Sequence, residues 1–391
     1  MYADELFMDG LVYKIWNFPV QWISRNILGN GEALSTEVTG SGDTTFHWIL
    51  FFLHIVISLV SALFICFLDK RRKSYIELFE YIKVYVRYYL AYFLLFYGII
   101  KIFCLQMPSP YLTTLNQPLG DFTPMGLLWS FIGASKSYSI LIGATETLAG
   151  CLLMFRKSYV LGAFLTFLVM LNVFVLNMCY DVPVKLFSFF LIIVSLYLLH
   201  PYFTNLYHLI ISKKQIIVRE DKPLFKNKRW QAPLSIAKFL IIVWMFYTNI
   251  SGILKIQKEF GSLAPTAPLH GKYRAITYNI SENMYHPFWN DSKNIKELII
   301  DKTGIGYAKV TMVNDNENFV SFHVDTTHKI IYMGIKGKTN PDTLTYSIPK
   351  PNQLLVGYNS KDLKILFDRQ VEDYKLERRG FHWINEVPYN R

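Results

Sequence analysis

Hydrophobic residues are distributed unevenly along the chain and divide it into two parts. Residues 47–256 contain apolar runs of about 20 residues, the length that crosses the hydrocarbon core of a bilayer, whereas residues 257–391 contain none. We predict six transmembrane helices, at about residues 47–68, 84–106, 137–155, 159–180, 185–199 and 234–256. A polytopic helical bundle is therefore expected over residues 47–256, with a separate domain after it.

Residues 257–391 follow a different period. Short runs rich in β-branched and aromatic residues recur about every 8 to 12 residues, with Asn, Asp, Gly and Pro between them. The expected strands lie at residues 295–300, 307–313, 319–324, 329–333, 344–348, 353–358 and 363–367. This spacing predicts a small antiparallel β-barrel.

Residues 1–46 are expected to form an amphipathic arm outside the membrane. Acidic side chains outnumber basic ones there, and Trp16 and Trp22 are suited to a membrane interface. The arm lacks the basic segment and apolar core of a cleavable signal peptide. Within the string Gly40-Ser-Gly-Asp-Thr-Thr45, we expect Asp43 or a threonine to cap the next helix.

Basic residues gather at the ends of the apolar runs and indicate a topology. The clusters fall in alternate loops, as the positive-inside rule requires of cytoplasmic segments, at residues 70–73, 156–157 and 213–229. Both the arm and residues 257–391 are therefore expected outside. Although the net charge is +11, the cations form no soluble basic face, so we do not expect nucleic acid as a partner.

The sequence indicates neither a metal centre nor a nucleophile motif. Histidines lack metal-ligand spacing, and His323 and His328, which flank a predicted turn, are expected at the surface. No chain of carboxylates marks an ion path. The cysteines form no CxxC motif and are expected to be buried, with a Cys104–Cys179 disulfide left open; they are Cys66, Cys104, Cys151 and Cys179.

Charged residues inside the apolar runs are the main candidates for function. A cation in hydrocarbon costs on the order of 2.5–3.5 kcal/mol, so Arg87 and Lys101 are expected to face a partner, water or a ligand. Helical geometry brings both to one stripe with Tyr97. By depth, Lys101 can reach Glu146 in the following helix, and we predict that these two residues pair.

Further polar residues lie near the same outer level, namely Asn177, Asp181 and Lys185. Two interpretations stay open: a buried polar network that fixes helix register, or a ligand site. A quinone head group would need hydrogen-bond donors and aromatic walls at membrane depth. The residues that could supply them are Lys101, Tyr97, Asn172 and Trp129.

Three groups of residues resemble the consecutive helices of the DoxX-like family of bacterial membrane proteins. They are Arg87-x-x-Leu90-Ala91-x-Phe93-x-x-x-x-Gly98-x-x-Lys101, Glu146-x-x-x-Gly150-x-Leu152-Leu153-x-x-Arg156 and Leu161-Gly162-Ala163. The resemblance implies a four-helix core over about residues 84–200 in a bacterial inner membrane. Some members of that family are associated with thiosulfate:quinone oxidoreductases or with complexes that handle thiol and oxidative stress.

Longer strings resemble a larger, Bacteroidetes-type subgroup of that family. They are residues 40–45, Met125-Gly-Leu-Leu-Trp129, Asp181-Val-Pro-Val-Lys185 and Arg379-Gly-Phe-His-Trp-Ile-Asn-Glu386. This chain departs from the four-helix pattern by adding helices at about residues 47–68 and 234–256. The subgroup tends to carry a further apolar helix before these, so the resemblance leads us to expect an incomplete N-terminus.

The predicted barrel carries a resemblance of its own. Leu269-His-Gly271-Lys-Tyr273 together with Arg378-Arg379 is similar to the lipocalin pattern, in which an aromatic residue packs under a late arginine. Tyrosine stands where that pattern usually has tryptophan. A lipocalin-like domain implies an apolar ligand or a capping role.

Two classes of function follow from these expectations. One is a redox-associated membrane subunit that binds a quinone near the outer leaflet and takes electrons from a protein partner, because no flavin, haem or dithiol motif is present. As an enzyme it would be at most one subunit of a quinone-linked complex. The alternative is a non-enzymatic assembly or lipid-binding protein, whose barrel contacts a lipid or an envelope partner.

Overall fold

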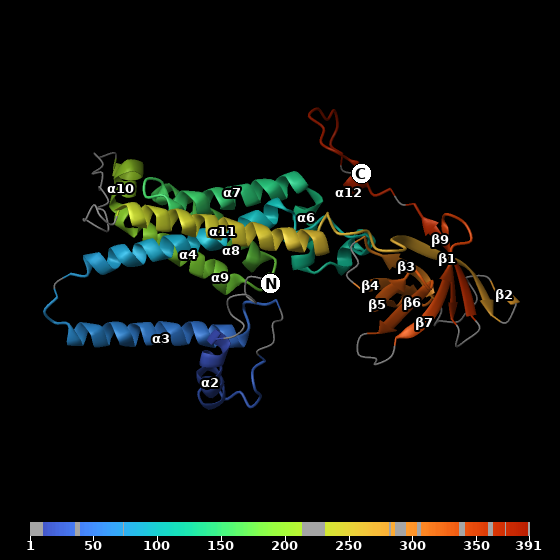
Figure 1. Ribbon diagram of the computed structural model, residues 1–391, viewed down its shortest axis with the longest axis horizontal. Coiled ribbons are helices and arrows are strands. Elements are labelled where there is room, and N and C mark those ends of the chain that lie inside the picture. The colour runs from blue at the N-terminus through green and yellow to red at the C-terminus, as the bar shows by residue number, and fades with distance from the viewer. Residues whose placement is uncertain are drawn as a thin grey trace. The chain divides into compact units, whose positions relative to one another are not determined.

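The computed structural model describes residues 11–35, 40–72, 74–212, 231–280, 283–285, 295–302, 306–335, 341–358, 363–371 and 373–389. The chain forms two compact units, one made of residues 1–99 and 143–249 and the other of residues 100–142 and 250–391. Unit 1 is helical, whereas unit 2 contains a β-barrel (Figure 1). The first ten residues of the predicted arm, Lys73 and the basic segment 213–229 lie outside the described residues.

The long helices that follow the arm match the predicted apolar runs. They are α3 (Thr45–Leu68), α4 (Ile76–Ile102), α7 (Lys136–Met154), α8 (Tyr159–Cys179), α9 (Lys185–Leu199) and α11 (Gln231–Glu259). Within the arm itself lies α2 (Leu11–Asn26). In the described part of the chain, five segments are long and apolar enough to cross a membrane, Thr45–Leu68, Lys136–Met154, Tyr159–Cys179, Lys185–Asn205 and Ala232–Glu259. The predicted polytopic helical fold is confirmed.

The sixth predicted span is the helix α4. It begins at Ile76 rather than near residue 84, because the segment before the apolar run is itself helical and carries a Glu80–Lys83 ion pair of 2.7 Å. At 27 residues it is about 40 Å long, more than a bilayer core needs. It ends at Ile102, two residues before Cys104, which has a positive φ of 53°.

The helices of unit 1 pack closely at glycines. A Cβ at Gly98 in α4 would lie 2.7 Å from the backbone nitrogen of Thr147 in α7. A Cβ at Gly162 in α8 would lie 2.7 Å from the backbone nitrogen of Leu153. Small residues thus let neighbouring backbones approach each other.

The predicted amphipathic arm is helical and packs on α3. Val20 of α2 is buried against Phe46, Ile49 and Leu50 at the start of α3. Figure 1 shows α2 beside that end of α3. Trp22 on the same helix stays exposed. The rest of α3 is largely exposed within the chain, which suits a helix that meets lipid.

Short helices complete the chain. The longest of them is α6, whose first turn is capped by the Thr123 hydroxyl accepting from the Gly126 amide at 3.1 Å. The short elements are α5 (Leu112–Leu115), η1 (Leu119–Asp121), α6 (Pro124–Ala134), η2 (His200–Tyr202), α10 (Phe203–Tyr207), η3 (His208–Ser212) and α12 (Lys375–Arg378).

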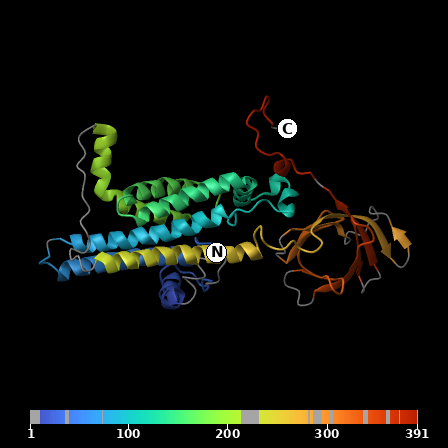
Figure 2. The same cartoon turned by 45° about the horizontal axis from the view of Figure 1, so that its top comes forward.

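Unit 2 contains a closed antiparallel barrel of eight strands. From β3 to β9 each strand pairs with the next, and β1 pairs with both β3 and β9 (Figure 2). The short β2 adds to the end of β1. The strands are β1 (Gly271–Ile280), β2 (Asn283–Tyr285), β3 (Ile295–Ile300), β4 (Tyr307–Met312), β5 (Glu317–Asp325), β6 (Ile330–Ile335), β7 (Asp342–Ser347), β8 (Gln353–Tyr358) and β9 (Leu363–Gln370).

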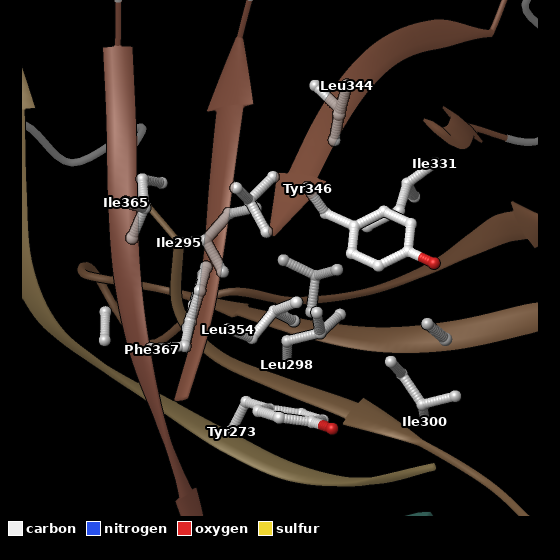
Figure 3. Close-up of a cluster of buried hydrophobic side chains, with 14 of the residues drawn as sticks. Tyr273, Ile295, Leu298, Ile300, Ile331, Leu344, Tyr346, Leu354, Ile365 and Phe367 are labelled. Carbon is white, nitrogen blue, oxygen red and sulfur yellow. The ribbon is translucent and has the colours of Figure 1, made fainter. Parts of the chain in front are cut away.

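Buried side chains from every one of these eight strands fill the barrel interior (Figure 3). Tyr278 belongs to this core, and its hydroxyl donates to the Ile295 carbonyl at 2.6 Å. Burial raises the pKa of Tyr278 to about 12. The alternation of buried and exposed positions confirms the predicted barrel, although the pattern had not indicated β1.

The arginine opposite Tyr273 differs from the prediction. Strand register places Arg369 of β9 against Tyr273 of β1. Arg378 instead pairs with Asp373, and the Arg379 guanidinium lies 3.9 Å from the Tyr389 ring centre. The expected pairing of Tyr273 with Arg378 or Arg379 is therefore wrong, because both arginines follow the last barrel strand.

Candidate functional site

Arg87 is buried in unit 1 and holds three helices together. Its Nε donates to the Leu153 carbonyl at 3.0 Å, and its guanidinium carbon lies 4.6 Å from the Tyr159 ring centre. The Leu153 carbonyl is in the last turn of α7, where helices leave carbonyl groups without partners. Arg87, one of the residues considered for a ligand, therefore donates a hydrogen bond to the end of a helix and lies against an aromatic ring.

Lys101 and Glu146 are both buried, at 7 % and 0 % exposed. Lys101 belongs to unit 2, where its carbonyl accepts from the Ser139 hydroxyl at 3.0 Å. Glu146 belongs to unit 1, so their pairing stays a prediction. Tyr97, one turn before Lys101, packs its ring 6.1 Å from that of Phe187.

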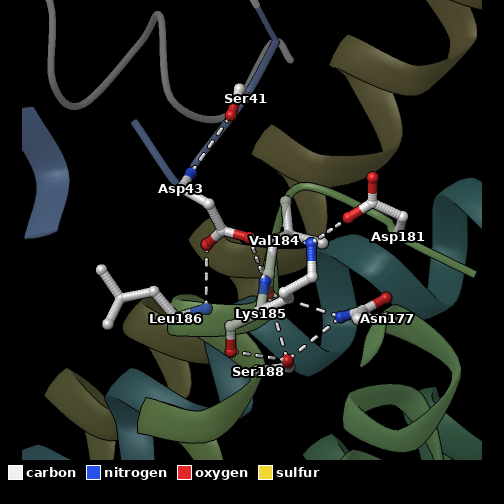
Figure 4. Close-up of polar contacts among 8 residues, drawn as sticks. All are labelled: Ser41, Asp43, Asn177, Asp181, Val184, Lys185, Leu186 and Ser188. Atoms are coloured by element: carbon white, nitrogen blue, oxygen red, sulfur yellow. Dashed lines mark hydrogen bonds and ion pairs between the residues drawn. The ribbon is translucent and has the colours of Figure 1, made fainter. Parts of the chain in front are cut away.

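Two of the predicted polar residues meet at the start of α9 (Figure 4). The Lys185 ammonium lies 2.8 Å from Asp181 and 3.9 Å from Asp43. Asp43 also accepts from the backbone nitrogens of Lys185 and Leu186, at 2.8 and 2.9 Å. The expectation that Asp43 or a threonine caps α3 is confirmed for Thr44, whereas Asp43 caps α9.

Asn177 fixes the turn between α8 and α9. Its side-chain nitrogen donates to the Ser188 hydroxyl at 3.0 Å and to the Val184 carbonyl at 3.4 Å (Figure 4). Like the Asp43 contacts, these bonds join neighbouring segments of the protein. The cluster at this end of the bundle therefore supports the network interpretation, in which polar groups set the register of helices.

The remaining predicted ligand residues are dispersed. Asn172 is exposed on α8, and Trp129 is half-buried on α6. Tyr97 and Asn172 belong to unit 1, whereas Lys101 and Trp129 belong to unit 2. A quinone site built from these four residues stays a prediction.

Unit 2 holds a pocket that the sequence did not indicate. Its volume is about 930 Å³, and it lies at the end of the barrel where β1 begins and β9 ends. One part of its lining is apolar and comes from the end of α4 and the segments that follow α4 and α11; it includes Ile102, Phe103, Pro108, Leu112, Leu115 and Phe260. The other part carries four fixed cations, Lys136, Lys272, Lys302 and Arg369.

The short helix α5 is fastened to the barrel beside this pocket. The Thr113 amide and hydroxyl donate to the Asp301 carboxylate, at 3.1 and 2.7 Å. Asn116 receives a hydrogen bond from the Lys272 ammonium at 2.8 Å and donates to the Tyr374 hydroxyl at 2.6 Å. Three distant segments of the chain thus build one wall.

Arg369 is positioned by the backbone at the start of β1. Gly271 has a φ of 148°, and a Cβ there would lie 2.7 Å from the Arg369 Nε. Glycine therefore leaves room for the arginine side chain to cross the strand. Burial raises the pKa of Tyr273, and the neighbouring Arg369 cation partly offsets that rise.

Gln257 contributes a buried amide to the pocket lining. The residue is 7 % exposed, and its Nε2 donates to the Ser262 hydroxyl at 2.7 Å. Its Oε1 accepts no hydrogen bond within the described ranges. A Cβ at Gly261 would lie 2.2 Å from this oxygen, so glycine there leaves room for the amide.

Local sequence patterns carry little signal for this pocket. Lys272 lies inside the string singled out for its lipocalin-like spacing, yet Asn116 and Tyr374 belong to no motif. Among the described residues no cluster of His, Cys, Asp or Glu could hold a metal. His323 and His328 are exposed as predicted. All four cysteines are free thiols, and the expectation that they are buried is wrong, because within the chain Cys66 and Cys179 are exposed and the other two are half-buried.

Comparison with known proteins gives one partial similarity. The chain is 34 % identical over 73 residues to the "Uncharacterized protein YwoB" of Bacillus subtilis (strain 168). This match covers 19 % of the chain and 47 % of that protein, so the chain spans about half the length of the curated relative. No family model matches the chain. No solved structure matches it either.

Proposed function

We propose that this membrane protein binds a lipid or a similar amphiphile in the pocket of unit 2. The observation that carries the proposal is the mixed lining, which combines apolar side chains near the ends of hydrophobic helices with cations from the barrel and, in Lys136, from the start of α7. An amphiphile has the same two-part chemistry, so one molecule can satisfy both parts. The volume of about 930 Å³ is in the range of sites that hold small molecules.

The proposed ligand pocket lies at the mouth of the barrel and not in the barrel interior. A cup-shaped lipocalin-like domain would hold its ligand among the inward-facing side chains, but here these side chains pack against one another. The ligand therefore lies outside the barrel core, against α5 and the start of β1.

A quinone is the second candidate ligand, in keeping with the resemblance to DoxX-like proteins. The observation that favours it is the buried Lys101, which directly precedes the pocket residue Ile102. In that role the protein is a redox-associated subunit, and its electrons come from a protein partner. The chain itself supplies binding and orientation of the head group.

For the cellular setting, we propose a bacterial inner membrane with the N-terminal arm and the barrel outside. The basic residues at 70–72 and 156–157 support this arrangement by the positive-inside rule. The pocket then faces the outer leaflet, where either candidate ligand is available.

Lipid retention tests the proposed function. The full chain is purified in mild detergent after incubation with a membrane lipid extract, and bound lipids are identified by native mass spectrometry. We expect a retained lipid that is lost when Leu112→Trp fills the pocket, whereas Leu168→Trp, on the exposed side of α8, retains it. Equal retention by both variants, or no retention by the parent protein, would contradict the proposal.

A further inference from the structure

We infer that the ligand of this pocket has an acidic head group that also carries a hydroxyl. In this arrangement Arg369 and Lys302 bind the anionic oxygens, and Gln257 accepts a hydrogen bond from the hydroxyl. This inference rests on the proposed lipid-binding function and specifies the chemistry of the lipid.

The pocket lining has an excess of positive charge. Among the described residues that line it, four carry a fixed positive charge and one, Glu377, carries a carboxylate. Two further carboxylates lie close by: Asp301 accepts two hydrogen bonds from Thr113, and Glu297 lies 3.9 Å from Lys272. The four cations still outnumber these three carboxylates. A concave surface with this balance raises the local concentration of anions.

Strand register places Lys302 on one side of β1 and Arg369 on the other. Gly271 pairs with Ile300 of β3, so Lys302 follows directly beyond one neighbouring strand. On the other side Lys272 pairs with Gln370, next to Arg369 of β9. Both side chains line the pocket, so a phosphate group at this strand end has cationic donors available from either side of β1.

Arg369 has the geometry of an anion-binding residue. Its guanidinium crosses Gly271 and makes no side-chain hydrogen bond or ion pair with the part of the chain that the structure describes. A planar guanidinium can donate two parallel hydrogen bonds to a phosphate or carboxylate. The glycine at residue 271 thus keeps this donor directed along the pocket wall.

Gln257 adds a buried hydrogen-bond acceptor, which an anionic group without a proton cannot satisfy. Its buried Oε1 is an acceptor without a donor among the described residues, and such a group costs about 1–3 kcal/mol. A phosphodiester offers acceptors only, whereas a hydroxyl of the head group can donate to this oxygen. Apolar side chains such as Phe103 and Phe260 remain for the acyl chains. An acidic phospholipid with a glycerol head group combines all three features.

Defined lipids separate these contributions. The full chain in detergent is titrated with phosphatidylglycerol, phosphatidylmethanol and phosphatidylcholine of the same acyl chains, and with inorganic phosphate, using native mass spectrometry to measure Kd. We expect phosphatidylglycerol to bind most tightly and phosphatidylcholine at least about tenfold more weakly, which corresponds to one strong ionic contact. Phosphatidylmethanol, which is acidic but lacks the hydroxyl, should lie between them.

Single substitutions assign the effect to residues. Arg369→Gln and Lys302→Gln should each weaken phosphatidylglycerol binding about tenfold and leave phosphatidylcholine unchanged. Gln257→Leu should remove the preference for phosphatidylglycerol over phosphatidylmethanol. The control Lys364→Gln, at an exposed position near the start of β9, should change nothing.

The outcomes distinguish this inference from the proposed function. Equal binding of phosphatidylglycerol and phosphatidylcholine, or no effect of either cation substitution, overturns the acidic head group while lipid binding stands. If inorganic phosphate binds as tightly as the lipid and displaces it, the site binds free phosphate, and the inference that the anion belongs to a lipid is wrong. If no lipid binds at all, the proposed function itself fails. Because Lys302 and Arg369 are exposed at the rim, at least one variant is expected to fold like the parent protein.

Discussion

At the scale of single residues, the buried Arg87 and the half-buried Lys185 of the bundle have partners inside the protein. Arg87 satisfies the end of α7 and lies on the Tyr159 ring, and Lys185 lies between two carboxylates. These contacts offset part of the desolvation of each charge. The polar residues of unit 1 that appear suited to a ligand in the sequence are therefore used, where their contacts are seen, to hold helices in register.

Replacing Arg87 tests this structural role. Arg87→Met removes the donor to the Leu153 carbonyl and should destabilise the protein by about 1–3 kcal/mol, seen as a lower Tm in detergent. Arg156→Met, an exposed arginine in the same unit, should leave the Tm within experimental error. An unchanged Tm for Arg87→Met, together with altered lipid retention, would instead assign Arg87 to ligand binding.

At the scale of secondary structure elements, glycine positions determine how closely α4 and α7 pack. A Cβ at Gly98 would lie 2.7 Å from the Thr147 backbone nitrogen and 2.8 Å from the Gly143 carbonyl oxygen. Backbone atoms cannot rotate away as a long side chain can, so the two helices themselves have to separate.

We predict that Gly98→Ala destabilises the bundle by about 1–3 kcal/mol through this separation. Gly252→Ala in α11 is the matched control, since nothing lies within 4 Å of a Cβ there. That control should be neutral or slightly stabilising, because alanine favours helix more than glycine. Thermal unfolding of both variants in the same detergent measures the difference; equal Tm values would show that α4 and α7 do not rely on the glycine contact.

At the scale of the whole molecule, the proposed topology places the barrel outside and the loop at 70–72 inside. In a background without native cysteines, Lys364→Cys and Arg71→Cys introduce single exposed thiols on the barrel and in that loop. A membrane-impermeant maleimide added to intact spheroplasts should label residue 364 and spare residue 71. Labelling of residue 71 alone would reverse the assignment.

Sequence periodicity accounts for much of the architecture. The helices α3, α7, α8, α9 and α11 match apolar runs, and the strands β3 to β9 match short β-rich runs. β1 escapes notice because charged and polar residues interrupt it and a bulge falls between Ala275 and Thr277. In the polar cluster at the start of α9, the grouping of Asn177, Asp181 and Lys185 is predictable from their depth along neighbouring helices.

The remaining features depend on residues that are far apart in the chain. Asp43 caps a helix that begins 142 residues later, and Thr113 binds Asp301, 188 residues away. No local pattern distinguishes an aspartate that caps the next helix from one that caps a distant helix. The same holds for Asn116, which accepts a hydrogen bond from the pocket residue Lys272 only because α5 lies against the barrel.

The sequence by itself determined the two-part architecture, because hydrophobic burial acts on every residue and its period follows the local backbone geometry. Tertiary structure alone decided which polar groups meet: Asp43 with α9, Arg87 with the end of α7, and Arg369 with Gly271 at the pocket wall. Hydrogen bonds and ion pairs act over a few ångströms between particular atoms, so their partners are set when distant segments pack together. The candidate ligand site belongs to this second class.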